Sequence, residues 1–447
     1  MELRSKSRIV MKFGGSVFRD AEGFHSAAKY MIKSAREKKP IAVVSAPKGV
    51  TDLLTTLYLK HDHRIVSDLK DGYKKILRSI SDDKVRLHAT KSIDRELRDL
   101  KKKMSFDQLV SKGENHSGIL LAHVLRSLGQ ESEYVDGYSG GIVASSKGVV
   151  RENLSVLNVG NNLGKYLGHN NHIVPVVGGF VGKELETGRY KLLGRNSTDI
   201  TGAIVAAAIG ADYEIVKDVP GIYFVEPEFG KSDTIPYLNY DEAGELTWRG
   251  VEVVHPVAIR IAASHNIPIR IKNLTEKEST LISGKSITTR ERPIAGISAR
   301  RFYFLTISDE QMSTEEGRGY LSNTTGALSN CGVDVYDVAT SANVISMTIQ
   351  QSDSMVKGEK IESIMKRALE EYGYKPTIQG RRIGAISVVG KALRDNTKII
   401  SRLMSLFFKR GINILMISKS NGQNIILGVD ESNLVRSIRA IHSELHG

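Results

Sequence analysis

The stretch Gly194–Ile222 reads GRNSTDITGAIVAAAIGADYEIVKDVPGI, and an earlier stretch, Val10–Val17, reads VMKFGGSV. Each joins a glycine-bearing loop to a charged residue beside an apolar strand or a helix of small residues. Glycines let backbone N–H groups approach a phosphate closely, and a lysine or a helix N-terminus favours negative charge there. The two stretches predict an α/β protein that binds a polyphosphate, with phosphoryl transfer as the leading hypothesis.

Short apolar strands alternate with amphipathic helices from Arg8 to about Leu281. The strand candidates are rich in Val and Ile: Arg8–Phe13, Ile41–Ser45, His172–Val177, Tyr213–Lys217 and Ile267–Ile271. This alternation is typical of a mainly parallel sheet with helices on both faces. Between Tyr58 and Lys103, charged residues at helical spacing predict a helical excursion from the sheet.

The composition and the pattern of predicted elements change after Ile282. The polar, basic Ser283–Arg292 predicts a linker, and beyond it a weak repeat begins at Gly332 and again at Gly411. Each copy follows a strand candidate and a helix candidate: Phe302–Ile307, Leu321–Asn330, Ile383–Val389 and Thr397–Lys409. Two α+β units of this kind beside a catalytic domain bind a small effector or pair subunits, and a dimerisation module without a ligand stays an alternative.

Composition narrows the function classes. At 447 residues the chain has room for two or three domains. Its net charge of +13 suggests nucleic acid, but the basic residues are spread out, aromatic residues are few and no nucleic-acid-binding signature is present. A positive field also attracts ATP and dicarboxylates. We therefore expect no nucleic-acid partner.

Location is expected to be cytoplasmic. No run approaches 18 apolar residues, so we expect no membrane span. The first strand candidate begins too early for a preceding signal or transit peptide. The single cysteine, Cys331, excludes an internal disulfide framework and fits a reducing compartment.

Particular side chains suit phosphate chemistry. Lys12 ends a strand before Gly14 and Gly15, where its ammonium group can follow charge on a transferring phosphoryl group. Arg195 offers a planar fork for a carboxylate. Asp199, with Thr198, stands at the start of a helix, where it either only caps the helix or positions lysines around the phosphates.

Seven motifs occur in the order found in aspartate kinases of the amino-acid-kinase superfamily: KFGGSV, SAPKGVTD (Ser45–Asp52), LVSKGE (Leu109–Glu114), GGFVG, GRNSTD, DVPGIY and VVHP (Val253–Pro256). The chain resembles these enzymes over nearly its whole length, least across the charged helical segment. The resemblance implies a three-layer amino-acid-kinase fold over residues 1–285, with a helical insertion at about 58–104. Two ACT-like (βαββαβ) domains would follow at 294–375 and 380–447.

The resemblance also implies roles for residues at matching positions. Lys12 and Asp199 would be catalytic, with Asp199 organising the phosphate site. ATP would contact Lys12, Gly14, Gly15, Ser16, Ser45, Lys217, Asp218 and Tyr223. Aspartate would contact Thr51, Glu114, Phe180, Arg195 and Thr198, with Glu114 facing its amino group and Arg195 a carboxylate. The metal ligands stay unassigned.

The implied activity is ATP-dependent phosphorylation of the L-aspartate side chain to 4-phospho-L-aspartate, the first step toward lysine, threonine and methionine, under feedback regulation. A carboxylate is already ionised at neutral pH, so it needs no general base. Alignment and positive charge, including Mg²⁺, then suffice, and His255 before Pro256 is expected to be structural. A kinase of another small carboxylate and a catalytically silent amino-acid sensor remain alternatives.

Three positions depart from the common family pattern. Glu252 and Glu228 stand where many members have a lysine and an arginine, and Lys217 is the candidate to compensate for them. GRNST, with Asn196, replaces the usual GRGGS.

The regulatory half matches the effector-binding loop and strand of related enzymes at Gly317–Leu321 and Asn330–Val335. The effector contacts would be Gly319, Tyr320, Leu321 and Tyr336. Lysine-inhibited members can have an acidic residue at the position of Tyr336, which weakens lysine as the effector and leaves threonine, another amino acid or none. A homodimer or higher assembly through these units is expected.

Overall fold

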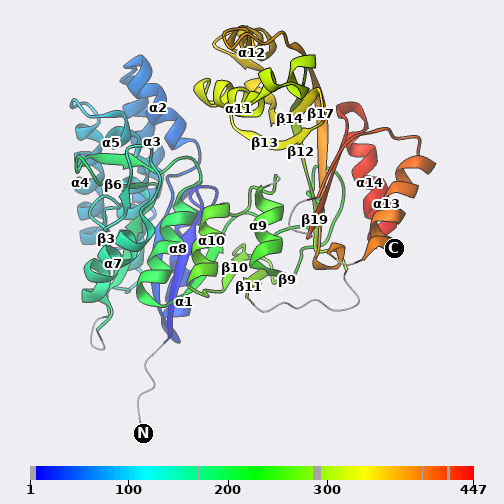
Figure 1. Cartoon of the computed structure of the whole chain (residues 1–447). Coiled ribbons are helices and arrows are strands. Elements are labelled where there is room, and N and C mark those ends of the chain that lie inside the picture. The colour runs from blue at the N-terminus through cyan, green and yellow to red at the C-terminus, as the bar shows by residue number, and fades with distance from the viewer. Residues whose placement is uncertain are drawn as a thin grey trace. The chain divides into compact units, whose positions relative to one another are not determined.

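The structure is a computed structural model that describes residues 7–168, 172–248, 250–284, 293–394, 396–419 and 423–446. The chain forms two compact units (Figure 1). The first holds residues up to Ile222, Thr234–Thr247 and the stretch that begins at Glu252. The second holds Tyr223–Asp233, Trp248–Val251 and the C-terminal part of the chain. Most of the linker expected at Ser283–Arg292 lies outside the described residues.

An eight-stranded sheet forms the centre of the first unit. Neighbouring strands are parallel except β10 and β11, which are antiparallel. Across the sheet the order is β3 (Ser132–Val135), β5 (Val174–Gly178), β2 (Lys38–Val44), β1 (Ser7–Phe13), β8 (Asp212–Val216), β10 (Ile269–Lys272), β11 (Thr280–Ser283) and β9 (Tyr237–Asn239). The mainly parallel sheet predicted from the apolar strand pattern is therefore confirmed.

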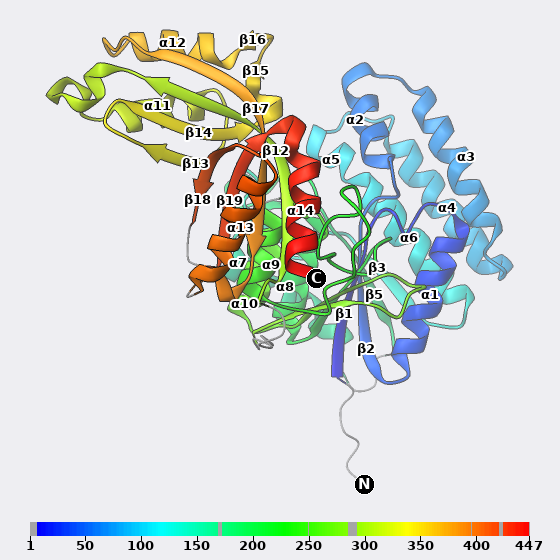
Figure 2. The ribbon, with the colours of Figure 1, turned by 90° about the vertical axis from the view of Figure 1, so that its right-hand side faces the viewer.

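Helices cover both faces of this sheet (Figures 1 and 2). Met11 and Phe13 of β1 enter a large apolar core with α1 (Ala21–Ala35) and α6 (Lys112–Ser127). Because side chains alternate along a strand, Lys12 lies on the opposite face, which α8 (Thr198–Ile209) covers. The strand pattern thus directs one lysine toward the start of α8.

Shorter elements complete the first unit. A small sheet contains β4 (Val143–Ala144), β6 (Val181–Glu184) and β7 (Tyr190–Leu192). The remaining helices are α2 (Val50–Lys60), α5 (Phe106–Val110), α7 (Glu152–Leu163), α9 (Tyr240–Trp248, whose last residue belongs to the second unit) and α10 (Pro256–Ser264).

The charged segment after Tyr58 forms two helices, α3 (Arg64–Arg78) and α4 (Asp83–Asp99). Its apolar residues, among them Leu69 and Ile93, join the same core as α1 and α6. The segment is therefore a packed part of the unit, and α4 lies directly against α6.

The second unit contains a six-stranded antiparallel sheet. Its order is β13 (Val335–Thr340), β14 (Val344–Gln350), β12 (Gly296–Ser308), β17 (Thr377–Val389), β19 (Asn424–Asp430) and β18 (Ile414–Ser418). The helices are α11 (Tyr320–Asn330), α12 (Ile361–Glu370), α13 (Thr397–Lys409) and α14 (Leu434–His446), and β15 (Met355–Val356) pairs with β16 (Glu359–Lys360). In Figure 2, α13 and α14 lie side by side.

Two long strands close both repeats. β12 and β17 pair along their entire length of 13 residues. Thr377–Arg382 therefore lies beside the end of β12 and completes the first repeat, while Gly296–Arg301 lies beside the end of β17 and completes the second. The predicted division between residues 375 and 380 falls at the start of β17, a strand that serves both repeats, and the division stays a prediction.

Among the described residues, no helix combines the length and the apolar character that a membrane crossing requires.

Candidate active site

The glycine loops meet where the parallel strands β1, β2, β5 and β8 end. Their ends are tied by backbone hydrogen bonds, in which Gly14 N donates to Val216 O (3.0 Å), Ser45 N to Phe13 O (3.1 Å) and Gly179 N to Val44 O (3.0 Å). Ligands of open α/β sheets bind beyond the carboxyl ends of the strands, where crossover connections diverge. The site is therefore expected at this edge.

Gly15 is required by the close approach of two loops. A Cβ atom at Gly15 would lie 2.5 Å from the carbonyl oxygen of Ala46, which is a clash with backbone. At Gly14 an added Cβ would lie 3.4 Å from Lys217 Cγ and 3.7 Å from Lys12 Nζ. Gly14 therefore keeps backbone bare beside two lysine side chains.

A buried ion pair lies behind these glycines. Lys12 Nζ lies 2.7 Å from Asp199 Oδ1, and the side chains are 5% and 1% exposed. Lys217 Nζ lies 3.7 Å from the other oxygen, Oδ2. One carboxylate thus faces two ammonium groups, so this cluster has excess positive charge with which to meet a phosphate.

The pKa values reflect this arrangement. Burial alone would raise the pKa of Asp199, but attraction from Lys12 and Lys217 outweighs it and holds the pKa below its usual value. Burial lowers the pKa of the Lys12 ammonium group, an effect that Asp199 opposes and the like charge of Lys217 strengthens.

Asp199 does more than cap a helix. The N-cap residue of α8 is Ser197, whose side chain makes no capping hydrogen bond. Asp199 Oδ2 instead accepts a hydrogen bond from His255 N (3.0 Å), across to the start of α10. His255 Nδ1 accepts from Val257 N (3.2 Å) and caps α10, in keeping with its expected structural role.

Glu114 lies in the first turn of α6 with 3% of its surface exposed. Its Oε1 accepts a hydrogen bond from Ala46 N (2.9 Å). Oε2 is buried and has no hydrogen-bond partner among the described residues. Burial raises the pKa of this carboxyl group to about 8.

The loop after β5 contains Phe180, and its Gly179 lies against Thr198 at the start of α8. Phe180 has a φ of +70°, which is uncommon for a bulky residue, and its side chain is buried. A Cβ at Gly179 would lie 2.4 Å from Thr198 Cγ2. Strained backbone of this kind concentrates at functional sites.

Arg195 lies in the loop before α8, where its side chain is 91% exposed. Its Nη2 lies 3.4 Å from Asp52 Oδ1, and Asp52 is also exposed. The backbone of this loop is unusual, with a φ of +94° at Gly194 and +60° at Asn196. A glycine-rich loop would adopt these angles without strain.

The remaining residues predicted to contact a ligand lie at the following places in the structure. Thr51 lies in the first turn of α2, and Ser16 is half-buried after the glycine pair. Asp218 is exposed and pairs with Arg19 (3.3 Å). Tyr223 belongs to the second unit.

Of the two acidic departures, Glu252 is exposed, and its carbonyl oxygen accepts a hydrogen bond from Lys217 Nζ (3.4 Å). Glu228 is also exposed.

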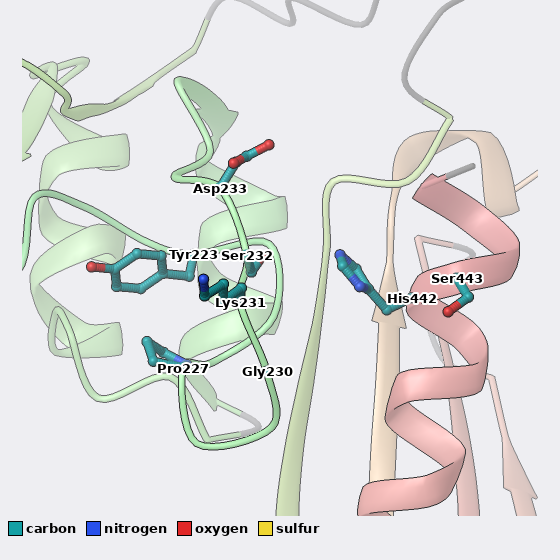
Figure 3. A pocket seen from close by; sticks show the side chains of 8 residues that line it. All are labelled: Tyr223, Pro227, Gly230, Lys231, Ser232, Asp233, His442 and Ser443. Atoms are coloured by element: carbon teal, nitrogen blue, oxygen red, sulfur yellow. The ribbon is translucent and has the colours of Figure 1, made fainter.

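A pocket of about 960 Å³ lies in the second unit, and Figure 3 shows the side chains that line it. Tyr223, Pro227 and Lys231 line it from one loop, and His442 points toward that loop from α14. Arg439 Nε also donates a hydrogen bond to Phe229 O (3.2 Å). The last helix is therefore attached to the loop that contains Tyr223.

The predicted effector residues lie in the first repeat. Gly319, with a φ of +82°, precedes α11, and Tyr320 is buried and donates a hydrogen bond to Asp309 Oδ2 (3.2 Å). Leu321 is exposed. Tyr336, on β13, accepts a hydrogen bond from Gln350 Nε2 (2.7 Å).

No group of three or more His, Cys, Asp and Glu side chains suitable for a metal ion occurs in the part of the chain that is described. The Asp199 carboxylate is engaged by two lysines. The donor set therefore fits a metal ion that arrives on nucleotide phosphates better than one held by the protein.

Sequence reasoning missed several supporting groups. Tyr213 donates its hydroxyl hydrogen to Asp199 O (2.9 Å), and Ala46 N and His255 N hold the two key carboxylates. Backbone donors leave no sequence signal. Tyr213 could have been found only as a polar residue within an apolar strand.

The buried cation cluster, the glycine loops and the mainly parallel sheet together define a nucleotide-dependent phosphotransferase site. The amino acid kinase family model matches residues 7–273, and an ACT domain model matches residues 386–445. The chain belongs to the amino acid kinase family.

Within that family the chain is similar to aspartokinases. Aspartokinase 1 of Arabidopsis thaliana, a chloroplastic protein, is 28% identical over 97% of this chain and 79% of its own length. Aspartokinase of Corynebacterium glutamicum is 23% identical over 98% and 95%. The fold matches E. coli aspartokinase III in complex with aspartate and ADP, with a TM-score of 0.81 at 21% identity over 99% of this chain and 100% of that one.

Proposed function

We propose that this chain transfers the γ-phosphoryl group of ATP to the side-chain carboxylate of L-aspartate, which yields 4-phospho-L-aspartate and ADP. The observation that supports this most strongly is the buried Lys12–Asp199–Lys217 cluster beside bare glycine backbone. Full-length similarity to aspartokinases supports the choice of substrate.

The reaction needs one bond made and one broken. A side-chain oxygen of aspartate forms a bond to the γ-phosphorus, and the bond from that phosphorus to the β,γ-bridging oxygen breaks, so that ADP leaves with the electron pair. Lys12 and Lys217 stabilise the charge on the phosphates, Gly15 presents its backbone N–H group, and the bare backbone of Gly14 allows close approach. Mg²⁺ bound to ATP would neutralise further phosphate charge.

Substrate recognition is assigned to the remaining edge residues. Glu114 takes the amino group of aspartate through its unpartnered oxygen, and Arg195 takes a carboxylate. Thr51, Phe180 and Thr198 complete this side, while Ser16, Ser45 and Asp218 serve the nucleotide.

Regulation and assembly belong to the second unit. We propose an amino-acid effector at Gly319, Tyr320, Leu321 and Tyr336, and a homodimer or higher assembly through the ACT-like repeats. A solved structure of E. coli aspartokinase III holds lysine and aspartate. Threonine and lysine are the effectors to test. The lone Cys331 supports a reducing, cytoplasmic setting.

A coupled ADP-release assay across amino acids and small carboxylates tests the proposal. We expect turnover with L-aspartate to exceed that with N-acetylglutamate, acetate and glutamate, and to fall when the true effector is added. Preference for another carboxylate would replace aspartate as the substrate. Absence of both turnover and ATP binding would favour a silent sensor.

A further inference from the structure

The carboxyl group of Glu114 is enclosed in protein without a counter-charge. Ala46 N binds one oxygen, and the other has no hydrogen-bond partner among the described residues. Within the described ranges, the interactions that favour its charged form come from backbone N–H groups. This differs from Asp199, the other buried carboxylate at this edge, which has two lysines.

The titratable groups on the elements packed around α6 do not supply that charge. Lys112 pairs with Glu96 of α4 (2.9 Å), and His116 meets the hydroxyl of Tyr73 of α3 at Nδ1 (2.9 Å). Burial lowers the pKa of His116 to about 3, so this ring is neutral at physiological pH. Other titratable groups near α6 include the buried phenol of Tyr134 on β3, exposed Lys48 after β2, Asp52 of α2 paired with Arg195, and Asp107 of α5 paired with Lys191.

An ionised carboxylate in such a place is costly. Removal of a charge from water without a partner costs far more than burial of the neutral acid. Burial accordingly raises the pKa of Glu114 to about 8. A cation placed beside Oε2 reverses this preference, because it supplies both the missing charge and the missing hydrogen bond.

We infer that Glu114 holds a proton in the ligand-free protein and releases it to solvent when the ammonium group of the amino-acid substrate binds beside Oε2. The O–H bond of the carboxyl group breaks, the proton passes to buffer, and the ammonium group keeps its three hydrogens. The inference rests on the proposed function, since it assigns the substrate ammonium group to Glu114.

Calorimetric titration of L-aspartate into the full-length protein measures this release directly. The binding enthalpy is measured at pH 7 in buffers with different protonation enthalpies. Its slope against the buffer protonation enthalpy should correspond to the release of about 0.9 proton per site. At pH 9 the release should fall to about 0.1 proton, because Glu114 is then already ionised. Succinate, which lacks the amino group, should bind without proton release or not bind.

Infrared spectroscopy reports the protonation state of Glu114 in the wild-type protein. This measurement does not require that a variant bind aspartate. Ligand-free protein at pH 7 should show a protonated-carboxyl C=O band that disappears when aspartate is added and is absent in Glu114→Gln. Glu152→Gln is the matched control, because Glu152 is a paired carboxylate on α7, away from α6, and its replacement should leave the band in place.

The outcomes separate the two claims. Aspartate that binds with heat independent of the buffer, or a ligand-free spectrum without the band, overturns the proton release and leaves the kinase function standing. Absence of aspartate binding overturns both. Buffer-dependent heat together with the band supports the inference.

Discussion

Lys12 Nζ and Asp199 Oδ1 lie 2.7 Å apart at a point almost closed to solvent, and His255 N binds the second oxygen of the same carboxylate. The ion pair joins the end of β1 to the start of α8, and the hydrogen bond continues to α10. One carboxylate therefore fixes three elements around the position where a phosphate would lie.

Replacement of Asp199 by Asn should cost stability as well as activity. The variant leaves Lys12 and Lys217 facing each other without a counter-charge, and breaking a buried pair costs about 3–5 kcal/mol. Urea unfolding should show this loss for Asp199→Asn and a smaller loss for the double variant Lys12→Met/Asp199→Asn, which removes the more deeply buried of the two ammonium groups. Equal losses in the two variants would show that the carboxylate does not balance Lys12.

The two loop glycines should differ in their tolerance of a methyl group. Gly15→Ala would place Cβ 2.5 Å from Ala46 O, whereas Gly14→Ala meets Lys217 Cγ at 3.4 Å. We expect Gly15→Ala to lower the free energy of unfolding by about 1–3 kcal/mol and Gly14→Ala to lower it by less, measured by urea unfolding. The reverse order would contradict the close contact between the two loops.

Glu114 should make stability depend on pH in a predictable direction. Its pKa is raised from 4.5 to about 8 on folding, so between these values the folded state binds more protons than the unfolded state. Stability from this group is then full below pH 4.5 and falls as the pH rises through this window, by up to about 5 kcal/mol.

The difference in unfolding free energy between wild type and Glu114→Gln isolates this effect from other groups. Wild type should lose stability relative to the variant from pH 5 to pH 8. Parallel pH profiles for the two proteins would show that Glu114 is ionised when folded.

Asp52 competes with substrate for Arg195 in this account. The two side chains are exposed, so Asp52→Asn should change the free energy of unfolding by less than about 1 kcal/mol. Because the guanidinium group is then free for a carboxylate, the KM for aspartate should fall while kcat changes little. Steady-state kinetics at low salt measures both values, and a higher KM would instead give Asp52 a direct role in substrate binding.

Local pattern predicted much of the fold. The range expected for α13, Thr397–Lys409, is the one observed, because amphipathic spacing and Asn396 as N-cap define it locally. The pairing of β12 with β17, by which each strand completes the repeat of the other, was not predicted. Strand pairing between distant segments leaves no local signal in the sequence.

The sequence predicted which residues belong to the site but not which of them contact one another. A glycine loop after a strand pointed to Lys12, and the family resemblance implied Lys217, while the residue pattern left open whether Asp199 only caps α8. Its partners are Lys12 of β1, Lys217 directly after β8 and His255 before α10, and the parallel sheet brings these residues together.

The most direct test of the central claim is aspartate-dependent ADP release by wild type, Lys12→Ala and Lys102→Ala. Lys102 is exposed and pairs only locally with Asp99, so its variant controls for a general loss of positive charge. We predict that Lys12→Ala lowers kcat by more than about 100-fold while Lys102→Ala retains wild-type turnover. Turnover by Lys12→Ala close to that of wild type would contradict a phosphoryl-transfer role for the buried lysine–aspartate pair.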